Sequence, residues 1–186
     1  TYIPLPESSP GVFSPDAVGL IINQLDNYDS LLVGCGMGRN SATVDMLERL
    51  LFSGVSLPPA VIDADALNFL SCSRNRAWWE RFPHRAIVTP HPGEMSLLSA
   101  LSIGAVEGDR AKIAAESSAR WEKIVVLKGA HTVVASPMGN VTINPFPNPG
   151  LASAGTGDVL AGIIAGLLAQ GLDMEVAAPL GVYIHS

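Results

Sequence analysis

The chain has 186 residues, of which 48% are hydrophobic and 15% are charged. Its 11 Lys and Arg stand against 17 Asp and Glu, which gives a formal net charge of −6 at pH 7. This composition is too hydrophobic for an intrinsically disordered protein and too acidic for one that binds nucleic acid through its phosphates. The length is that of one compact domain with its own hydrophobic core.

The sequence carries no signal for a membrane or for secretion. The longest run without a polar side chain covers residues 159–169, half of the ~20 residues that a membrane-spanning helix needs. The chain does not open with a basic and then apolar segment, and it has two cysteines, Cys35 and Cys72, which form no CxxC pair. We therefore expect a cytoplasmic protein with no membrane partner.

Strand and helix patterns alternate along the first two thirds of the chain. Ser14 followed by Pro15 is typical of a helix start, and helical spacing recurs over 41–53 and 107–121. Strand-type runs that are apolar on both faces occupy four positions between these helices: 30–34, 60–63, 86–89 and 124–128. Such strands, separated by amphipathic helices, are typical of parallel βαβ units.

The pattern changes in the last third. Residues 132–136 and 141–144 alternate between apolar and polar and are joined by the turn 137–140, which predicts an antiparallel hairpin at one edge of the sheet. A proline-rich loop and a glycine-rich segment then lead into a helix that we expect to be buried, ending at Gly171. A final helix begins near Asp173. The predicted fold class is α/β, with a mostly parallel sheet and an antiparallel hairpin at one edge.

The strongest chemical signal is Gly155-Thr156-Gly157-Asp158 at the start of the apolar helix. A helix N-terminus offers unpaired backbone N–H groups and a partial positive charge, so glycines there suit an anion such as phosphate. The carboxylate of Asp158 would repel that anion, and it makes chemical sense as the base that takes a proton from an attacking hydroxyl. The alternative is that Asp158 only caps the helix.

A second glycine-rich loop, Gly34-Cys35-Gly36-Met37-Gly38, follows a predicted strand. It is not the dinucleotide motif GxGxxG, because position 39 is Arg. Two interpretations stay open here: a loop that admits a ligand, or an ordinary tight turn between a strand and a helix.

Acidic residues and one histidine follow two other predicted strands. Asp63, Asp65 and Glu94 could converge on a hydrated Mg²⁺ at the carboxyl ends of parallel strands, or Asp65 and Glu94 could simply complement helix N-termini. His91 lies between two prolines, which suits either a substrate contact or a structural role. Lys128 could neutralise a phosphate, with Gly129 allowing close backbone approach, or it could face solvent.

Four segments resemble the ADP/ATP-dependent NAD(P)H-hydrate dehydratases of the ribokinase-like superfamily: VIDADALNFL (61–70), TPHPGEMSLL (89–98), VVLKGAHTVVASPMGNV (125–141) and NPGLASAGTGDVLAGIIAGLLAQG (148–171). The wider superfamily has Asn where this chain has His91, which is the dehydratase variant. The resemblance implies a ribokinase-like three-layer α/β/α fold. It also implies that residues 1–186 are a single domain truncated at both ends, since family members begin earlier and their last helix continues.

The resemblance also implies a reaction, in which ADP or ATP phosphorylates the ring hydroxyl of hydrated NADH or NADPH and phosphate then leaves. Asp158 would be the catalytic base. The other implied roles are an anion hole (Gly155, Thr156, Gly157), a nucleotide site (Lys128, Gly129, Ala130, His131, Thr132, Gly157) and a substrate site (Gly36, His91, Asp158). Mg²⁺ is expected with the nucleotide, and Asp63 and Glu94 are the candidate ligands.

The expected partners are NADH hydrate and NADPH hydrate, a homo-oligomer of the full-length protein, and a fused or separate NAD(P)H-hydrate epimerase. Two alternatives remain open. One is a ribokinase-like kinase for a small alcohol such as a thiazole or pyrimidine vitamin precursor, and the other is a catalytically silent nucleotide-binding fragment. The motif TPHPGE favours the dehydratase, and the intact Asp158 argues against the silent fragment.

Overall fold

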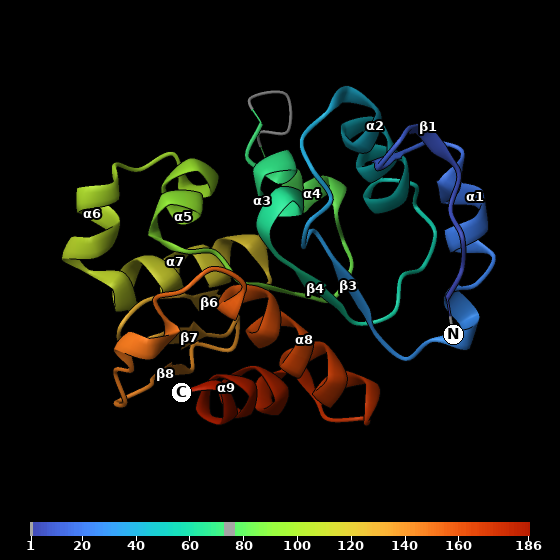
Figure 1. The fold of residues 1–186 in the computed structure, drawn as a ribbon. Coiled ribbons are helices and arrows are strands. Elements are labelled where there is room, and N and C mark those ends of the chain that lie inside the picture. Colours follow the sequence, from blue (N-terminus) through green and yellow to red (C-terminus); the bar gives the residue numbers. More distant parts are fainter. Residues whose placement is uncertain (1, 73–76) are drawn as a thin grey trace.

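The computed structural model, which describes residues 2–72 and 77–186, is built around one six-stranded sheet in the order β3-β4-β5-β6-β7-β8 (Figure 1). The parallel strands are β3 (Leu31–Val33), β4 (Ala60–Ile62), β5 (Ala86–Val88) and β6 (Ile124–Leu127). Antiparallel pairing then adds β7 (Val133–Ala135) and β8 (Val141–Ile143). All four parallel strands and the hairpin predicted from the sequence are confirmed.

Helices cover both faces of this sheet, which confirms the three-layer arrangement (Figure 1). The last two helices, α8 (Thr156–Ala169) and α9 (Met174–His185), lie together on one face. Within the described residues, the helices on the side of the other face are α1 (Ala17–Ile22), α2 (Ser41–Leu51), α3 (Ala64–Leu70), α4 (Trp78–Arg81), α5 (Pro92–Ser99), α6 (Ile103–Gly108) and α7 (Arg110–Trp121). Short elements complete the chain: β1 (Glu7–Ser9), β2 (Val12–Phe13), η1 (Leu25–Asn27) and η3 (Pro149–Leu151).

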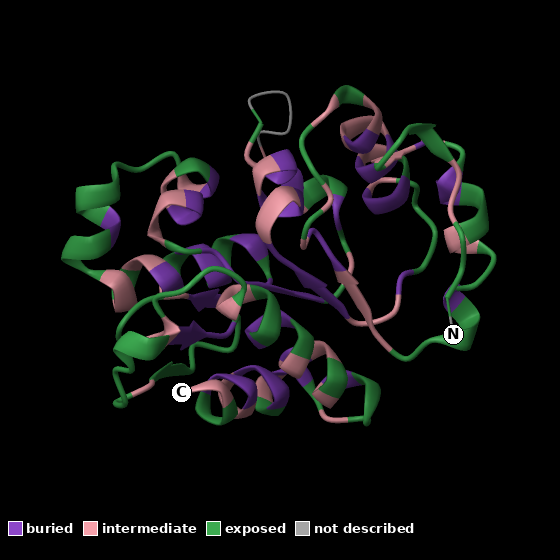
Figure 2. Ribbon diagram, viewed as in Figure 1, coloured by how far each residue is buried: buried purple, intermediate pink, exposed green. Residues whose placement is uncertain are grey.

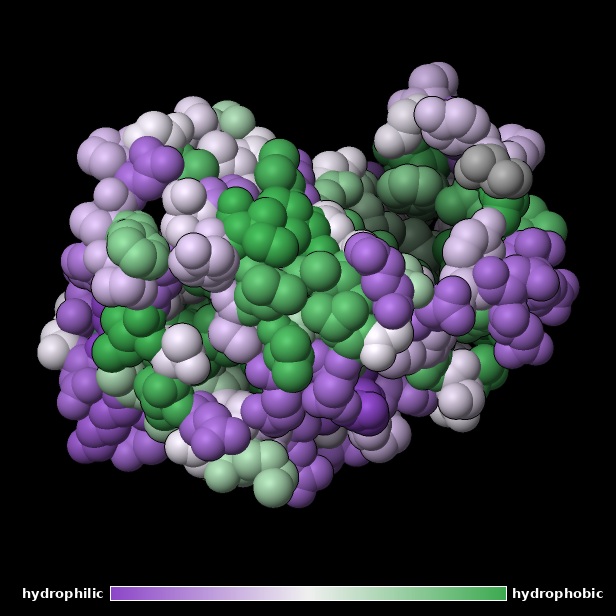
Figure 3. All heavy atoms as spheres, turned by 90° about the horizontal axis from the view of Figure 1, so that it is seen from below, coloured by the Kyte–Doolittle hydropathy of each residue, from purple (hydrophilic) through white to green (hydrophobic). Residues whose placement is uncertain are grey.

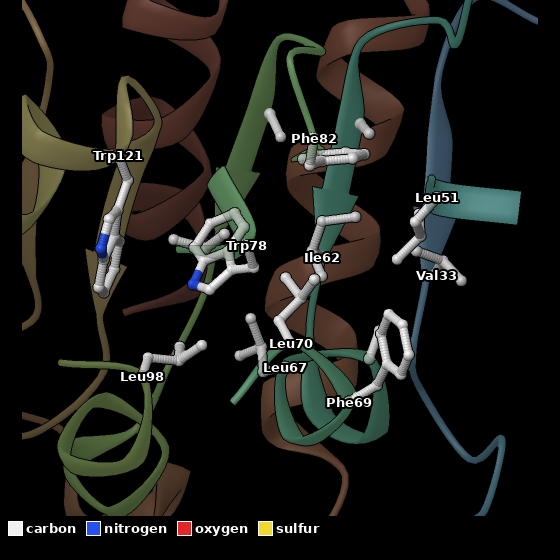
Figure 4. Close-up of a cluster of buried hydrophobic side chains, with 14 of the residues drawn as sticks. Val33, Leu51, Ile62, Leu67, Phe69, Leu70, Trp78, Phe82, Leu98 and Trp121 are labelled. Atoms are coloured by element: carbon white, nitrogen blue, oxygen red, sulfur yellow. The ribbon is translucent and has the colours of Figure 1, made fainter. Parts of the chain in front are cut away.

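Alternation along the strands divides the hydrophobic interior into two cores. On β4, Ala60 and Ile62 face the core shared with helices α1 to α7, whereas Val61 faces the core shared with α8 and α9. Figure 2 shows the central parallel strands β4, β5 and β6 buried throughout, whereas the edge strand β3 is only partly buried. In the larger core, Trp78 packs against Trp121 with ring centroids 5.4 Å apart (Figure 4). Because helices pack on both faces of a parallel sheet, its strands need apolar residues on both faces.

Two sequence predictions about helices are corrected. The helix expected over 107–121 is broken: α6 ends at Gly108, and the side chain of Asp109 accepts a hydrogen bond of 3.1 Å from the backbone N–H of Lys112 and so caps α7. A side chain that caps a helix start competes with continuous helix at that residue. The elements β1, β2, α3, α5 and α6 were not predicted.

The apolar helix α8 is buried on one side only, and its exposed side is also largely apolar. Leu160, Ile164 and Leu168 lie in the core, whereas Val159 is exposed. Figure 3 shows hydrophobic side chains gathered on the face of the molecule formed by α8 and α9. Of the helices that the structure describes, none is long and apolar enough to cross a membrane.

Candidate active site

Four loops meet at the carboxyl ends of the parallel strands, where open α/β sheets bind ligands. They follow β3 (Gly34), β4 (Asp63), β5 (Thr89) and β6 (Lys128), and the start of α8 joins them. A chain of backbone hydrogen bonds ties the loops together, because Asp63 N donates to Val33 O, Thr89 N donates to Ile62 O and Lys128 N donates to Pro90 O. These bonds fix the relative position of the side chains that follow each strand.

Asp63 is the buried centre of this site, with 1% of its side chain exposed. Its position depends on Gly34, where a Cβ atom would overlap the carbonyl oxygen of Asp63. The next residue, Ala64, adopts a left-handed backbone with φ of 47°, which is strained for a residue with a side chain. The glycine and the strained turn together place a carboxylate at the base of the site.

Lys128 supplies the cation for two carboxylates. Its Nζ lies 2.7 Å from Oδ1 of Asp63 and 3.9 Å from Oε2 of Glu94. Asp63 and Glu94 are the Mg²⁺ ligands predicted from the sequence, but a metal ion between them would have to displace the ammonium. The pair therefore does not fit a resident Mg²⁺ in this arrangement.

Glu94 and His91 cap helix α5 reciprocally. The Nδ1 of His91 accepts the backbone N–H groups of Gly93 and Glu94 at 3.0 and 3.3 Å, and Glu94 Oε2 accepts the backbone N–H of His91 at 2.8 Å. An imidazole thus takes the capping place that Ser, Thr, Asp or Asn usually holds. Because Nδ1 accepts, the ring proton is on Nε2, and this nitrogen belongs to a side chain that is 57% exposed. Burial raises the pKa of Glu94 above its usual value.

Asp158, in the first turn of α8, faces Asp63 and Cys35. One ligand atom from each of these three residues lies within 4.8 Å of the other two. Burial first, and the charges of Asp63 and Asp158 second, raise the pKa of the Cys35 thiol to about 12. The thiol stays protonated at neutral pH and is a poor ligand for Mg²⁺, which prefers oxygen. Cys35 was not predicted as a site residue, although the glycines on either side of it marked the loop.

A cavity of about 450 Å³ opens on the other side of the α8 N-terminus. Lys128, Gly129, Ala130 and Thr132 line it from the loop after β6, and Thr156 and Gly157 line it from α8. Its further walls are mostly apolar and come from the proline-rich loop and α9, including Phe146, Pro149, Leu151, Val182 and His185. Gly157 lines this cavity and also adjoins the carboxylate cluster, since a Cβ on it would lie 3.4 Å from Lys128 Nζ and 4.0 Å from Asp63 Oδ2.

Some residues named from the sequence lie elsewhere. His131 is not among the residues that line the cavity, and its ring contacts the carbonyl oxygen of Asn144 at 3.2 Å. Asp65 holds the glycine-rich loop: Oδ2 accepts Gly38 N–H at 2.8 Å and Oδ1 accepts Arg39 Nε–H at 2.9 Å. Gly36 sits in that loop with φ of 66°, beside Cys35. Gly155 is the N-cap residue of α8 and has a left-handed conformation with φ of 89°.

The sequence model of the NAD(P)H-hydrate dehydratase family matches residues 5–186. The chain belongs to this family. A bifunctional NAD(P)H-hydrate repair enzyme, Nnr, from Moorella thermoacetica is 46% identical over 181 residues, which cover 97% of this chain and 33% of that protein.

Solved structures agree with this membership. The ADP/ATP-dependent NAD(P)H-hydrate dehydratase from Bacillus subtilis, crystallised with ATP/Mg²⁺ and soaked with CoA, has a TM-score of 0.71 at 28% identity, over 92% of this chain and 67% of that one. A ribokinase-like superfamily protein from Enterococcus faecalis has a TM-score of 0.75 at 30% identity, over 92% of this chain and 58% of that one. The ribokinase-like fold is therefore confirmed. The chain spans a third of the Moorella protein and about three-fifths of the Enterococcus one.

Proposed function

We propose that this chain is the catalytic core of a nucleotide-dependent lyase that restores NADH and NADPH from their hydrated forms. Family membership over residues 5–186 supports the reaction class. The observation that carries it to this chain is the position of the α8 N-terminus, which separates a lysine-lined cavity of about 450 Å³ from an exposed carboxylate, Asp158. A nucleotide on one side and a hydroxyl on the other would meet at Gly157.

In this proposal the terminal phosphoryl group of ADP or ATP passes to the hydroxyl on the nicotinamide ring. Asp158 takes the hydroxyl proton as the new O–P bond forms and the bond to the nucleotide breaks. The backbone N–H groups of Gly155, Thr156 and Gly157 and the ammonium of Lys128 stabilise the negative charge on the phosphoryl oxygens. Phosphate then leaves with the C–O bond electrons, assisted by the ring nitrogen, and the neighbouring carbon loses a proton to form the C=C bond.

The nucleotide would occupy the cavity beside residues 128–132 and α9, and the hydrated nicotinamide would lie near Gly36 and His91. Mg²⁺ would arrive with the nucleotide and supply charge neutralisation of its phosphates, held by phosphate oxygens and water rather than by a set of protein ligands. The name of the Moorella relative as a bifunctional repair enzyme supports a second repair activity, an epimerase, joined to this domain in the same protein or acting beside it.

One assay separates this function from its alternatives. The protein that carries these residues is incubated with hydrated NADH and ADP or ATP, and the return of reduced-nicotinamide absorbance is followed together with released phosphate. A dehydratase releases one phosphate for each NADH restored. A small-alcohol kinase would leave the absorbance unchanged and release no free phosphate, and a silent fragment would bind ADP without turnover.

A further inference from the structure

Arg110 lies directly behind the turn that follows β6. It is the first residue of α7, and its Nη2 donates hydrogen bonds to the carbonyl oxygens of Leu127 and Lys128, both at 2.8 Å. One guanidinium group therefore holds two successive carbonyl groups at the point where the strand ends. The Lys128 side chain and the glycine after it start from this held segment.

Gly129 has no side chain at the point where the Arg110 guanidinium approaches the turn. Its φ of 157° is at the edge of the region that side-chain-bearing residues avoid, and a Cβ there would lie 2.5 Å from Nη1 of Arg110. The absence of a side chain at Gly129 leaves room for the Arg110 guanidinium, and the sequence had suggested room only for a ligand. On the opposite side of the turn, Lys128 N donates to Pro90 O at 2.8 Å, so the backbone is held from both directions.

The surroundings of Arg110 disfavour its positive charge. Burial lowers the pKa of its guanidinium, and the carboxylate of Glu107 offsets this in part. Its hydrogen-bond acceptors are neutral carbonyl groups, and its buried Nε has no partner among the residues that the structure describes. A half-buried positive charge of this kind is stabilised by an anion placed nearby. Gly129, which the guanidinium abuts, lines the cavity beside α8.

We propose that Arg110 is a positioning residue for the nucleotide: it fixes the Lys128–Gly129 turn in the shape that receives the terminal phosphates of ADP or ATP. Arg110 does not touch the reacting atoms. It acts through the backbone it holds and through the positive charge it adds behind Gly129. This inference rests on the proposed function, because it assigns the cavity to the nucleotide.

The test compares three variants with the wild type: Arg110→Ala, Arg110→Lys, and Arg120→Ala as a matched control on the same helix. Hydrogen bonds from a charged donor are lost in the first, so the KM and Kd for ADP should rise about tenfold to a hundredfold while kcat changes little. Arg110→Lys should recover part of the affinity, because an ammonium can donate to both carbonyls but lacks the planar fork. Millimolar guanidinium should restore ADP affinity to Arg110→Ala and leave Arg120→Ala unchanged.

The outcomes distinguish a failure of the proposed function from a failure of the proposed role of Arg110. ADP binding is measured by calorimetry alongside turnover, so a wild type that binds ADP without dehydrating the hydrate would refute the proposed function and still report on Arg110. An unchanged ADP Kd in Arg110→Lys and Arg110→Ala, or a melting-temperature loss without an affinity change, would overturn the positioning role. Should Arg110→Ala not fold, full ADP affinity in Arg110→Lys would overturn it equally.

Discussion

The Nζ of Lys128 lies 2.7 Å from Oδ1 of Asp63, although the two residues are 65 positions apart and follow different strands. Strand β5 lies between β4 and β6 in the sheet, so the ion pair crosses over one strand. Lys128 reaches Glu94 as well, at 3.9 Å. The ammonium thus interacts with both buried acidic groups at the base of the site, so its loss should affect folding as well as the proposed binding of phosphate.

Replacing Lys128 should destabilise the protein strongly. In Lys128→Met the Asp63 carboxylate is left buried without its cation, and the free energy of unfolding should fall by about 3–5 kcal/mol. The exposed Lys112→Met is the matched control and should change it by less than about 0.5 kcal/mol. Adding Asp63→Asn to Lys128→Met should recover part of the loss, since the carboxylate closest to the missing ammonium is then replaced by a neutral amide. Urea denaturation checks all three, and equal effects of the two lysine variants would contradict the argument.

Replacing Asp158 should remove turnover and spare the nucleotide. Asp158→Asn keeps the shape of the side chain and loses the base, so kcat should fall about 10²- to 10⁴-fold. Asp158 is not among the cavity-lining residues, so the Kd for ADP should stay within a few-fold of the wild-type value. The exposed Asp29→Asn is the control. Retention of more than a few per cent of the wild-type rate would show that another group takes the proton.

Two substitutions separate the capping role of His91 from its proposed substrate contact. His91→Ala removes the acceptor of two backbone N–H groups, so it should cost about 1 kcal/mol of stability and raise the KM for the hydrate. His91→Asn supplies another good N-cap acceptor, so stability should return while the KM stays high. Thermal melts and steady-state kinetics give the two readouts. A normal KM in His91→Asn would mean that the imidazole serves only the helix.

Stability should depend on pH through Glu94. Its pKa is raised in the folded state, mainly by burial, so the folded protein binds more protons than the unfolded chain once the pH passes the ordinary value of 4.5. The contribution of Glu94 to stability is therefore complete below pH 4.5 and is lost as the pH rises through the raised pKa. Relative to Glu94→Gln, the wild type should become less stable over that range in urea titrations. Glu116→Gln, on an exposed face of α7, should show no such trend.

The two cysteines should differ in reactivity. Cys35 has its pKa raised to about 12, and Cys72 is exposed. Because thiolate is the reactive form, a thiol reagent at pH 8 should label one cysteine in the folded protein and two after denaturation. Cys72→Ser should leave the folded protein unlabelled. Rapid modification of Cys35 in that variant would contradict the crowded, acidic surroundings described for it.

The strands and the helix that starts at Thr156 could be predicted from the sequence because their signals are local. Parallel strands buried on both faces require continuous apolar runs, and 60–63 and 124–128 carry them without reference to distant residues. Residues 155–158 likewise stand directly before an apolar run, so their place at the N-terminus of α8 follows from the order of residues. The break at Asp109 was missed because a capping side chain and a continued helix have similar local patterns there.

The partnerships within the site needed the tertiary structure. The sequence gives no reason to join Lys128 to Asp63, to bring Cys35 against Asp158, or to place Arg110 behind Gly129. These pairs depend on the order of the strands in the sheet, because it sets which loops and helix N-termini meet at one edge of the sheet. Local patterns therefore determined which residues could carry the chemistry, whereas packing of the four strands decided which charges face one another and which buried groups share a cation.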